Sequence, residues 1–486
     1  MKNELKISFL FCDFLLPLQS KNYTVLTLIK SISGIRGTIG GKPGESLSPI
    51  DIVKYTAAFA SFIYENTGKK KLVIGRDARI SGPMLENLVI STLVAMGFEV
   101  VNLGLSTTPT VEIAVPMEQA GGGIILTASH NPKEWNALKL LNAAGEFISD
   151  KDGQKILKIA AKEKFEFADV NDLGTVTVND TYFDKHIEKI LALPLVEKGA
   201  IAMKEFKIIV DAVNSTGALV VPKLLKALGV NDVQVLFDDV SGKFAHNPEP
   251  LPENLSALAN EVKFRKANLG IAVDPDVDRL CFVTEEGEMF GEEYTLVAIS
   301  DYILQHTKGA TVSNLSSTKA LKDVTEKNGC EYFGAAVGEV NVVSKMKEVN
   351  AVIGGEGNGG VIYPELHYGR DALVGIALFL THLAKSNKTM KLLRNTYPDY
   401  TIVKNKFTLE KEVDLNELFE KIAVKYKNEK LNRIDGLKIE MEEGWVHLRQ
   451  SNTEPIIRIY AESRYKNIAE NMTLKIMSDI KEFTAN

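Results

Sequence analysis

Cysteine is scarce in this sequence. Only Cys12, Cys281 and Cys330 occur among 486 residues, far apart and without CxxC spacing. A disulfide framework and a cysteine-based zinc site are therefore not expected, and the scarcity suits a reducing compartment such as the cytoplasm. Long apolar runs are also missing, since none approaches the roughly 20 residues that a membrane helix needs. Hydrophobic residues make up 45% and charged residues 25% of the chain, which is the balance of a globular protein rather than a disordered or fibrous one.

Neither sign of charge dominates the chain. Lys and Arg total 57 against 63 Asp and Glu, which leaves a net charge of −6. Such a mildly acidic chain has no overall field that would hold nucleic acid or an anionic membrane. We therefore expect no nucleic-acid partner and no membrane partner, and any anionic ligand must be bound by a local cluster of donors.

The apolar stretch at residues 7–18 (ISFLFCDFLLPL) follows two lysines and has some features of a signal peptide. Asp13 and Pro17 interrupt it, and no small-residue cleavage site follows. We expect residues 1–26 to form an N-terminal extension before the first domain, and we expect the protein to be cytoplasmic.

Short apolar strands alternate with amphipathic helices along most of the chain. Strands are expected at residues 71–75, 99–103, 123–126, 206–210, 268–273, 311–314 and 351–354, and helices at 83–96, 216–228, 318–328 and 370–384. This alternation predicts an α/β fold with mostly parallel sheets that are covered on both faces. The units are too numerous for one compact domain, so we predict three α/β units in series.

The C-terminal part of the chain has a different pattern. Helices are expected at residues 414–425 and 466–483, with strands at 437–440, 445–449 and 456–461 between them. That order predicts an α+β domain with an antiparallel sheet and helices on one face. The polar stretch at residues 397–406 is the best boundary before it. The expected division is an extension at 1–26 and domains at 27–175, 176–289, 290–395 and 396–486.

The segment TASHNP at residues 127–132 directly follows the strand expected at 123–126. In parallel α/β sheets, ligands bind at the C-terminal ends of strands. Ser129 is therefore a candidate nucleophile or phosphate carrier. A serine in such a turn is by itself more often a turn former or a helix cap, so this interpretation depends on the other segments.

The segment DPDVDR at residues 274–279 places Asp274, Asp276 and Asp278 after another expected strand. In extended backbone these carboxylates would project to one side. Their mutual repulsion predicts a hard divalent cation such as Mg²⁺, whose remaining ligands would include a phosphate oxygen. An EF-hand calcium loop does not fit, because Arg279 stands where that loop needs glycine. A solvated acidic turn is the remaining alternative.

Two further segments have the composition of ligand-binding loops. RQSNTEP at residues 449–455, with Arg458 beyond it, offers guanidiniums, hydroxyls, an amide and backbone N–H groups for a phosphate. A hairpin loop with incidental arginines is the alternative. In GGEGNGG at residues 354–360 the glycines allow a close approach to a ligand, and Glu356 and Asn358 could pair with sugar hydroxyls. This segment lacks the spacing of a P-loop or a dinucleotide-binding turn, and by itself it is also typical of a flexible loop.

Two basic residues elsewhere are candidates for the same site. Arg36 lies between two glycines in SGIRG at residues 33–37. Lys139 lies on the alternating strand WNALKLL, ten residues after Ser129, and could point toward the same cleft. A solvent-facing strand lysine is an equally ordinary interpretation of Lys139.

Taken together, SGIRG, TASHNP, DPDVDR, GEGNGG and RQSNTEP occur in the order and spacing of the α-D-phosphohexomutase superfamily of phosphoglucomutases, phosphomannomutases and phosphoglucosamine mutases. The sequence resembles that family from about residue 27 to the end. The resemblance implies three related α/β domains and a smaller, mobile fourth domain, arranged as a heart-shaped protein around a central cleft. It also implies that Ser129 is a phosphoserine, that Arg279 steadies the phosphoryl group, and that one Mg²⁺ is bound by a phosphoserine oxygen with Asp274, Asp276 and Asp278.

The resemblance implies roles for the remaining candidates as well. Glu356 and Asn358 fall on the sugar-recognition loop, and Arg36 and Lys139 lie near the phosphoserine, with Lys139 as a candidate proton shuttle. The loop that binds the non-transferred phosphate is implied to contain Arg449, Ser451, Asn452, Thr453 and Arg458.

The sequence departs from the family pattern at two positions. Gly360 stands where many members carry a histidine, and residues 337–340 (VGEV) occupy the stretch where a second histidine is often found. A proton path through those imidazoles is therefore not expected, and Lys139 or His130 becomes the expected proton carrier. The GEGNGG variant resembles the phosphoglucosamine mutase branch more than the glucose and mannose enzymes.

We therefore expect a Mg²⁺-dependent phosphohexomutase that converts glucosamine 6-phosphate to glucosamine 1-phosphate through a sugar 1,6-bisphosphate, a step toward UDP-N-acetylglucosamine. The alternatives are a phosphomannomutase/phosphoglucomutase, a non-enzymatic regulator that binds sugar phosphates, and a Mg²⁺-dependent phosphatase. The expected partner is a small sugar phosphate, and the expected assembly is a monomer or homodimer.

Overall fold

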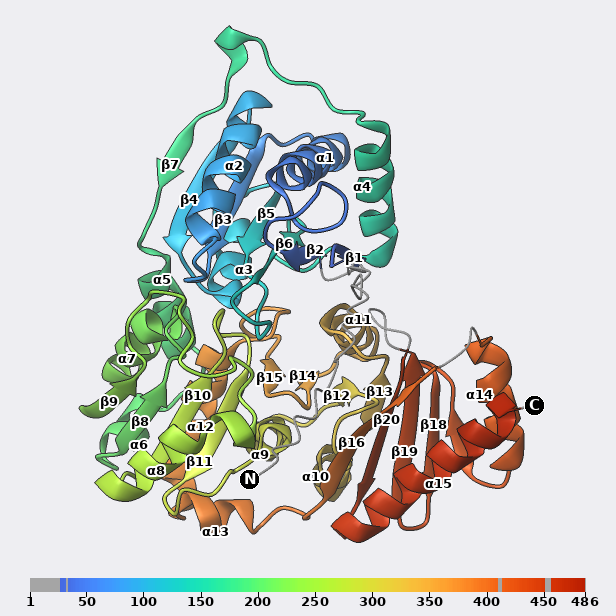
Figure 1. Ribbon diagram of the computed structural model, residues 1–486. Coiled ribbons are helices and arrows are strands. Elements are labelled where there is room, and N and C mark those ends of the chain that lie inside the picture. The colour runs from blue at the N-terminus through green and yellow to red at the C-terminus, as the bar shows by residue number, and fades with distance from the viewer. Residues whose placement is uncertain (1–26, 32–33, 410–412, 451–455, 486) are drawn as a thin grey trace, which may run out of the picture.

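The computed structural model describes residues 27–31, 34–409, 413–450 and 456–485. These residues form four sheet-based units that follow one another along the chain (Figure 1). Within the described residues, no helix is long and apolar enough to cross a membrane.

The first unit, at the top of Figure 1, is a seven-stranded sheet with the order β1-β2-β6-β5-β3-β4-β7. Its elements are β1 Ile29–Ser31, β2 Gly34–Thr38, α1 Pro49–Thr67, β3 Lys71–Arg76, α2 Gly82–Ala95, β4 Glu99–Leu105, α3 Thr108–Met117, β5 Gly122–Leu126, β6 Trp135–Leu141, α4 Asp150–Lys162 and β7 Val176–Val178. Leu72 and Ile74 share a core cluster with α1, α2 and α4, whereas Val73 packs in the cluster of α3. Because successive strand residues point to opposite faces, helices cover both faces of this sheet.

The second and third units are four-stranded sheets that share one hydrophobic core. The second contains α5 Tyr182–Leu191, α6 Lys198–Ala202, β8 Lys207–Asp211, α7 Gly217–Ala227, β9 Asp232–Leu236, α8 Ser256–Arg265, β10 Leu269–Val273 and β11 Leu280–Thr284. The third contains α9 Glu292–His306, β12 Thr311–Asn314, α10 Ala320–Lys327, β13 Tyr332–Ala335, α11 Glu339–Val349, β14 Ile353–Glu356, β15 Gly360–Ile362, α12 Ala372–Ser386 and α13 Met390–Arg394. Helix α12 is almost wholly buried and lies in that shared core, which joins the two units.

The first three units repeat one arrangement of strands. The orders β6-β5-β3-β4, β11-β10-β8-β9 and β15-β14-β12-β13 correspond strand for strand. In each unit three strands are parallel and the last one turns back as an antiparallel neighbour, in the pairs β5–β6, β10–β11 and β14–β15. The segments TASHNP, DPDVDR and GEGNGG are the connections in these three pairs. The repeat therefore places the three candidate segments at equivalent positions in related units.

The fourth unit confirms the expected α+β organisation. Its five strands, in the order β16-β20-β19-β18-β17, are all antiparallel to their neighbours. The elements are β16 Thr401–Thr408, α14 Leu415–Lys425, β17 Lys430–Asn432, β18 Leu437–Met441, β19 Gly444–Gln450, β20 Ile456–Ser463 and α15 Lys466–Ala485. Both helices share a single core cluster with the strands and so cover one face of the sheet.

One expected boundary and the expected extent of one connection differ from the observed strands. Strand β7, which the division after residue 175 assigns to the second domain, pairs with β4 at the edge of the first sheet. The polar stretch at 397–406 is only partly a connection, because β16 begins at Thr401 and pairs with β20. Alternating half-buried and exposed residues on this edge strand explain its polar composition.

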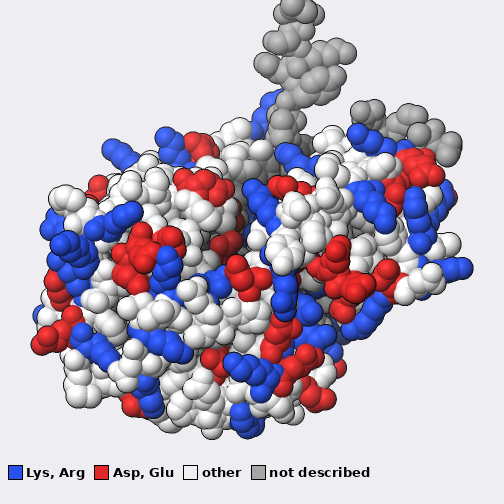
Figure 2. All heavy atoms as spheres, turned by 90° about the horizontal axis from the view of Figure 1, so that it is seen from below, with Lys and Arg blue, Asp and Glu red and all other residues white. Residues whose placement is uncertain are grey.

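The charged side chains of the face shown in Figure 2 are mixed in sign. Lys and Arg lie beside Asp and Glu across this face, without a broad field of either sign. This distribution agrees with the expectation from net charge that anion binding depends on local groups.

Candidate active site

Ser129 lies directly after β5, in a backbone conformation that is unusual for a residue with a side chain. Its φ is +49°, in the left-handed region, and the residue is only 7% exposed. Its Oγ donates a hydrogen bond of 2.7 Å to Asp274 Oδ2, and His130 Nδ1 lies 3.4 Å from the same Oγ. A buried serine held in a costly conformation is typical of a functional position.

Arg79, which is fully buried, supports the loop that carries Ser129 through hydrogen bonds to its backbone. Its guanidinium donates to the backbone oxygens of Ser129, Asn131, Pro132 and Trp135, and its Nε lies 3.0 Å from Asp77 Oδ2. Sequence reasoning missed this residue. The available signal was the charged pair in RDAR immediately after strand β3, at the same edge of the sheet as Ser129.

Asp274, Asp276 and Asp278 are fully buried and their carboxylates meet, with one oxygen of each within 4.8 Å of the others. The backbone is not extended, as the sequence argument assumed. It forms a turn with Val277 at φ +60°, in which Asp274 Oδ1 accepts the backbone N–H groups of Asp278 and Arg279 at 3.1 Å each. The turn, rather than an alternating strand, brings the three side chains together.

The electrostatics of this trio suit a cation. Burial and the charges of Asp278 and Asp276 raise the pKa of Asp274 well above its ordinary value. Burial opposes the ionisation of Asp278 too, but the neighbouring Arg370 and Lys139 keep its pKa below the ordinary value. Among the described residues, Oδ1 of Asp276 and Oδ1 of Asp278 accept no hydrogen bond. These oxygens are therefore available to a hard divalent ion.

Lys139 points into the same site from β6. Its Nζ lies 2.6 Å from Asp276 Oδ2 and 3.2 Å from Asp278 Oδ2. Burial would lower the pKa of Lys139, but the two carboxylates outweigh it and raise this pKa, so the side chain is an ammonium ion. The alternative of a solvent-facing strand lysine is therefore wrong.

The guanidiniums of Arg36, Arg279 and Arg370 lie close to the aspartate trio or to one another. Arg279 Nη1 lies 3.0 Å from Glu249 Oε1, and Arg36 projects from β2. Burial and the nearby charges of Arg279 and Arg370 lower the pKa of Arg36. Cations that repel one another in a buried site favour the binding of an anion such as phosphate.

Glu356 lies at the end of β14, at the expected sugar-recognition loop. Its Oε1 accepts from Asn314 Nδ2 at 2.9 Å and from the backbone N–H of Gly338 at 3.0 Å. Asn358 folds back on its own loop, where its Oδ1 accepts the N–H of Gly360 at 3.2 Å. The structure thus holds Glu356 rigidly and places Asn358 in the turn beside it.

Arg370 connects the sugar loop to the aspartates, and sequence reasoning missed it. Its Nη2 donates to Asp278 Oδ2 at 2.7 Å, its Nε to Glu339 Oε2 at 3.0 Å and its Nη1 to Glu356 Oε2 at 3.1 Å. The residue follows β15 and is 8% exposed. An arginine in HYGRD, in the connection between β15 and α12, was the signal in the sequence, and it became meaningful only when three distant carboxylates were seen around it.

The sequence matches four descriptions of one family, in order along the chain. These are "Phosphoglucomutase/phosphomannomutase, alpha/beta/alpha domain I" over residues 28–167, the corresponding domain II over 182–287 and domain III over 291–400, and the C-terminal domain over 403–477. The chain belongs to the phosphoglucomutase/phosphomannomutase family. It is therefore a phosphohexomutase, an isomerase that moves a phosphoryl group on a sugar phosphate.

Relatives of this phosphohexomutase carry two kinds of name. It is 34% identical over 434 residues to a phosphoglucomutase/phosphomannomutase of Thermococcus kodakarensis, covering 88% of this chain and 94% of the relative. It is 32% identical over 446 residues to a phosphoglucosamine/phosphogalactosamine mutase of Sulfurisphaera tokodaii, covering 90% and 96%. A solved family member from Burkholderia thailandensis superposes with a TM-score of 0.79 at 25% identity, over 94% of this chain and 97% of that one.

In this phosphohexomutase the expected phosphate-binding loop is described only at its flanks. Ser451, Asn452 and Thr453 lie outside the described residues, so their assignment stays a prediction. Arg449 at the end of β19 is opposite Arg458 on β20 in the strand register. Arg449 Nε lies 2.7 Å from Asp435 Oδ2. Two neighbouring guanidiniums at the base of the loop are compatible with anion binding.

The fourth domain of the phosphohexomutase contacts the third through polar groups. His447 Nδ1 lies 2.9 Å from Ser316 Oγ, and Lys438 Nζ donates to the carbonyl of Leu315 at 2.7 Å. These contacts join strands β18 and β19 to the third domain.

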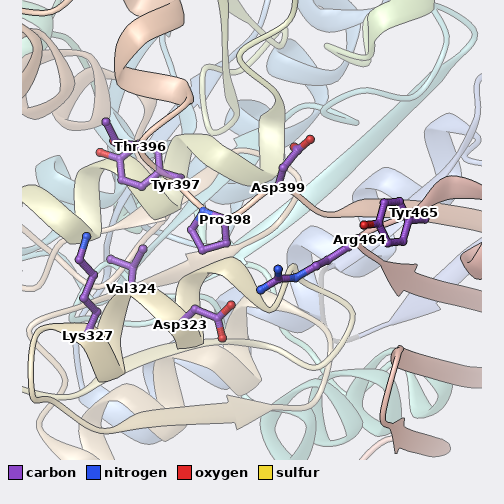
Figure 3. Close-up of a pocket in the computed structure, with 9 residues that line it drawn as sticks. All are labelled: Asp323, Val324, Lys327, Thr396, Tyr397, Pro398, Asp399, Arg464 and Tyr465. Atoms are coloured by element: carbon purple, nitrogen blue, oxygen red, sulfur yellow. The ribbon is translucent and has the colours of Figure 1, made fainter.

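A pocket of about 570 Å³ lies beside the connection between these two domains (Figure 3). Asp323, Lys327, Asp399 and Arg464 line it, and none of the candidate site residues in the described part of the chain does. The pocket therefore belongs to the junction of the two domains rather than to the site around Ser129.

Proposed function

We propose that this phosphohexomutase carries its transferable phosphoryl group on Ser129, uses one Mg²⁺ at the aspartate trio, and converts glucosamine 6-phosphate to glucosamine 1-phosphate. The observation that carries the proposal is the 2.7 Å contact between Ser129 Oγ and Asp274 Oδ2. A phosphate on this Oγ would lie against three buried carboxylates, an arrangement that needs a cation between them.

The residues present fit Mg²⁺. The trio offers oxygen ligands alone, and among the described residues neither Asp276 Oδ1 nor Asp278 Oδ1 accepts a hydrogen bond, although Arg279 Nε lies 4.0 Å from the latter. When bound, the ion would neutralise charge on the transferring phosphoryl group. A phosphoserine oxygen would complete the ligands that the protein gives to the ion.

We also propose domain limits near residues 27, 178, 289 and 395, which place each motif in its own domain.

The chain's own residues account for the transfer steps. The bond between phosphorus and Ser129 Oγ breaks while a bond forms between phosphorus and a hydroxyl oxygen of the sugar phosphate, which gives a sugar 1,6-bisphosphate. In the second step the other phosphate returns to Ser129 after the bisphosphate has turned over. Arg36 and Arg279 supply positive charge that positions the phosphoryl group, which is the main contribution that phosphoryl transfer needs from a protein.

Proton transfer falls to His130 and Lys139. Burial and the charge of Arg279 lower the pKa of His130 well below its ordinary value, so its imidazole is neutral and can accept a proton. Its Nδ1 lies 3.4 Å from Ser129 Oγ, within reach of a small side-chain rotation. Lys139 is held as an ammonium ion by Asp276 and Asp278. This pairing makes it a weaker acid than a free lysine, so His130 is the better proton carrier of the two.

The preference for an amino sugar is supported by the charge of the sugar loop. Glu339 and Glu356 share the guanidinium of Arg370 with Asp278, which also pairs with Lys139, so the two glutamates leave negative charge for a ligand ammonium group. The name of the Sulfurisphaera tokodaii relative agrees with this preference. The name of the Thermococcus kodakarensis relative favours the second candidate, a phosphoglucomutase/phosphomannomutase.

A coupled assay decides between these substrates. We would measure kcat/KM for glucosamine, glucose and mannose 6-phosphates, each with a trace of its 1,6-bisphosphate. We expect the glucosamine substrate to be preferred, and we expect Glu356→Gln to reduce that preference. A higher kcat/KM for glucose or mannose phosphate would overturn the substrate assignment, and phosphate release faster than isomerisation would favour a phosphatase.

A further inference from the structure

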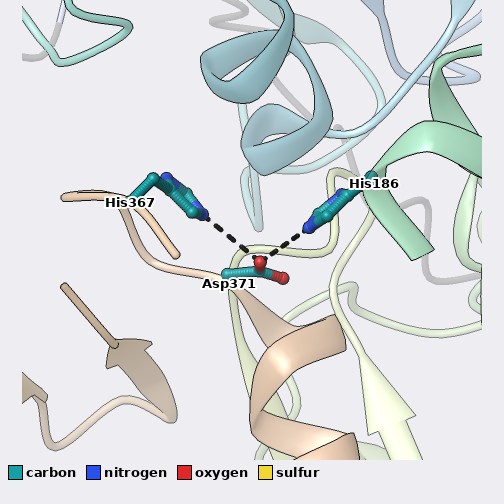
Figure 4. A group of neighbouring side chains, drawn as sticks. All are labelled: His186, His367 and Asp371. Carbon is teal, nitrogen blue, oxygen red and sulfur yellow. Dashed lines mark hydrogen bonds and ion pairs between the residues drawn. The ribbon is translucent and has the colours of Figure 1, made fainter. Parts of the chain in front are cut away.

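A second cluster of potential ligands lies outside the site described above. His186 on α5 and His367 before α12 both face one oxygen of Asp371, as Figure 4 shows. Asp371 Oδ2 lies 2.9 Å from His186 Nε2 and 3.3 Å from His367 Nε2. One ligand atom from each of the three residues lies within 4.8 Å of the others. His186 and Asp371 are fully buried, whereas the side chain of His367 is 13% exposed.

The groups behind these three residues fix their orientation. The other oxygen of Asp371 caps α12 by accepting the N–H groups of Leu373 at 2.8 Å and Val374 at 3.3 Å. The Nδ1 of His186 lies 3.0 Å from Thr110 Oγ1, and the Nδ1 of His367 lies 3.4 Å from Glu112 Oε2. Each imidazole therefore presents Nε2 to Asp371 and has an oxygen at its other nitrogen.

When its imidazole is neutral, His367 has one hydrogen too few for its surroundings. A neutral imidazole carries one N–H, but both nitrogens of His367 face carboxylate oxygens, those of Glu112 and Asp371. Whichever nitrogen bears the hydrogen, the lone pair of the other points at a carboxylate.

Glu112 is the other partner in this unsatisfied contact. It is 1% exposed, and among the described residues neither of its oxygens, nor Nδ1 of His367, makes a hydrogen bond. A buried carboxylate without a donor is costly, and such groups in native proteins call for an explanation.

We propose that His186, His367 and Asp371 bind a divalent transition-metal ion of the Zn²⁺ class. With the ion on both Nε2 atoms, Nδ1 of His367 must carry its hydrogen and would donate it to Glu112, which satisfies both groups. Histidine ligands whose second nitrogen donates to a carboxylate or hydroxyl are the common arrangement of zinc sites. Imidazole ligands favour Zn²⁺ over Mg²⁺, so this site is chemically distinct from the aspartate trio.

Binding of a metal ion would require one side chain, His367, to move. Ligand atoms about 2.0–2.1 Å from a tetrahedral ion lie roughly 3.3 Å apart, close to the two N–O distances observed here. The two imidazole centroids are 6.4 Å apart, so His367, the partly exposed ring, must turn toward His186. The ion would join the second and third domains through its ligands and the first domain through Thr110 and Glu112. It would also fix Asp371 beside Arg370 of the active site.

Metal binding by the full chain tests the proposal. Chelator-treated protein in excess Mg²⁺ would be dialysed against micromolar Zn²⁺, with bound zinc measured per chain by atomic emission. We expect His367→Gln to bind one zinc fewer than the wild type, and we expect Glu112→Gln to weaken that binding by about 10–100-fold. His246→Gln is the matched control, because His246 also lies 3.1 Å from a carboxylate, that of Asp211, but without a second histidine.

A second readout separates this site from the aspartate trio. Co²⁺ bound at this site should show a strong visible absorption band, because its coordination number would be low and its ligands would include imidazole. The band should survive Asp276→Asn and disappear in His367→Gln. Equal zinc content and equal spectra in the wild type and His367→Gln would overturn the proposal. It would also be overturned if all the zinc bound by the wild type were lost in Asp276→Asn.

Discussion

The side chain of Arg370 occupies the space in which residue 360 would otherwise have a side chain. A Cβ added at Gly360 would lie 2.3 Å from Arg370 Cδ, far inside van der Waals contact. The position where many relatives carry a histidine is thus glycine here because an arginine from after β15 lies over it. That arginine joins Asp278 to Glu356, so the two loops are connected without the imidazole.

We predict that Gly360→Ala displaces Arg370 and lowers both stability and activity. Forcing a methyl group into this contact should cost about 1–3 kcal/mol of unfolding free energy. Urea denaturation and kcat/KM measure the two effects. Gly199→Ala is the control, because nothing lies within 4 Å of a Cβ added in helix α6, so this variant should be as stable as the wild type or slightly more so. An unchanged Gly360→Ala would contradict the packing argument.

We predict that Arg79→Met strongly destabilises the protein. The change leaves Asp77 as a buried carboxylate without its cation and removes the donors to the Ser129 loop, so the loss should be about 3–5 kcal/mol. The matched control is Arg265→Met. Its exposed pair with Glu261 on helix α8 should be worth only about 0.3–0.5 kcal/mol. Similar losses in the two variants would show that Arg79 does not hold the loop.

Glu293 should make stability fall as pH rises through neutrality. Its half-buried carboxyl group lies beside Gly357 of the sugar loop, and desolvation raises its pKa to about 8. The protonated form is favoured in the folded state, so the contribution is fully present below the unfolded pKa near 4.5 and is lost as pH rises through about 8. The slope should not exceed about 1.4 kcal/mol per pH unit. Denaturation between pH 5 and 8 should show a flatter profile for Glu293→Gln, and parallel profiles would refute the assignment.

Removal of divalent ions should abolish mutase activity, and added Mg²⁺ should restore it. Asp276→Asn should lower kcat/KM by at least about 100-fold even at high Mg²⁺, because a bound ion is worth several kcal/mol to a transferring phosphoryl group. Asp232→Asn, at an exposed carboxylate on β9, should retain wild-type kinetics. Full activity in the presence of a strong chelator would exclude the metal-assisted mechanism.

The sequence predicted the parts of the site that depend on local order. Ser129 and the aspartates each follow a strand, and the repeated strand–turn–strand arrangement brings them together even though 145 residues separate Ser129 from Asp274. The expected helices and strands were mostly found within a few residues of their predicted positions. Even so, the aspartates converge through a left-handed turn at Val277, which alternation along a strand did not predict.

Residues that act through distant partners could not be predicted in this way. Arg370 pairs with Asp278 across 92 residues, and Arg79 supports Ser129 across 50. Neither partner can be identified from the neighbouring sequence alone, because each contact depends on how separate loops pack at one edge of the sheets. The same reason hid Glu112, which looks like one polar residue in an apolar helix until the histidines beside it are seen.

Transfer of labelled phosphate tests the central claim most directly. The protein would be incubated with a sugar 1,6-bisphosphate carrying ³²P, then digested, and the labelled peptide would be identified by mass spectrometry. We predict one labelled phosphate per chain on Ser129, and its release to added sugar monophosphate at a rate no slower than turnover. Label on another residue, or a Ser129→Ala variant with the mutase rate of the wild type, would contradict the account.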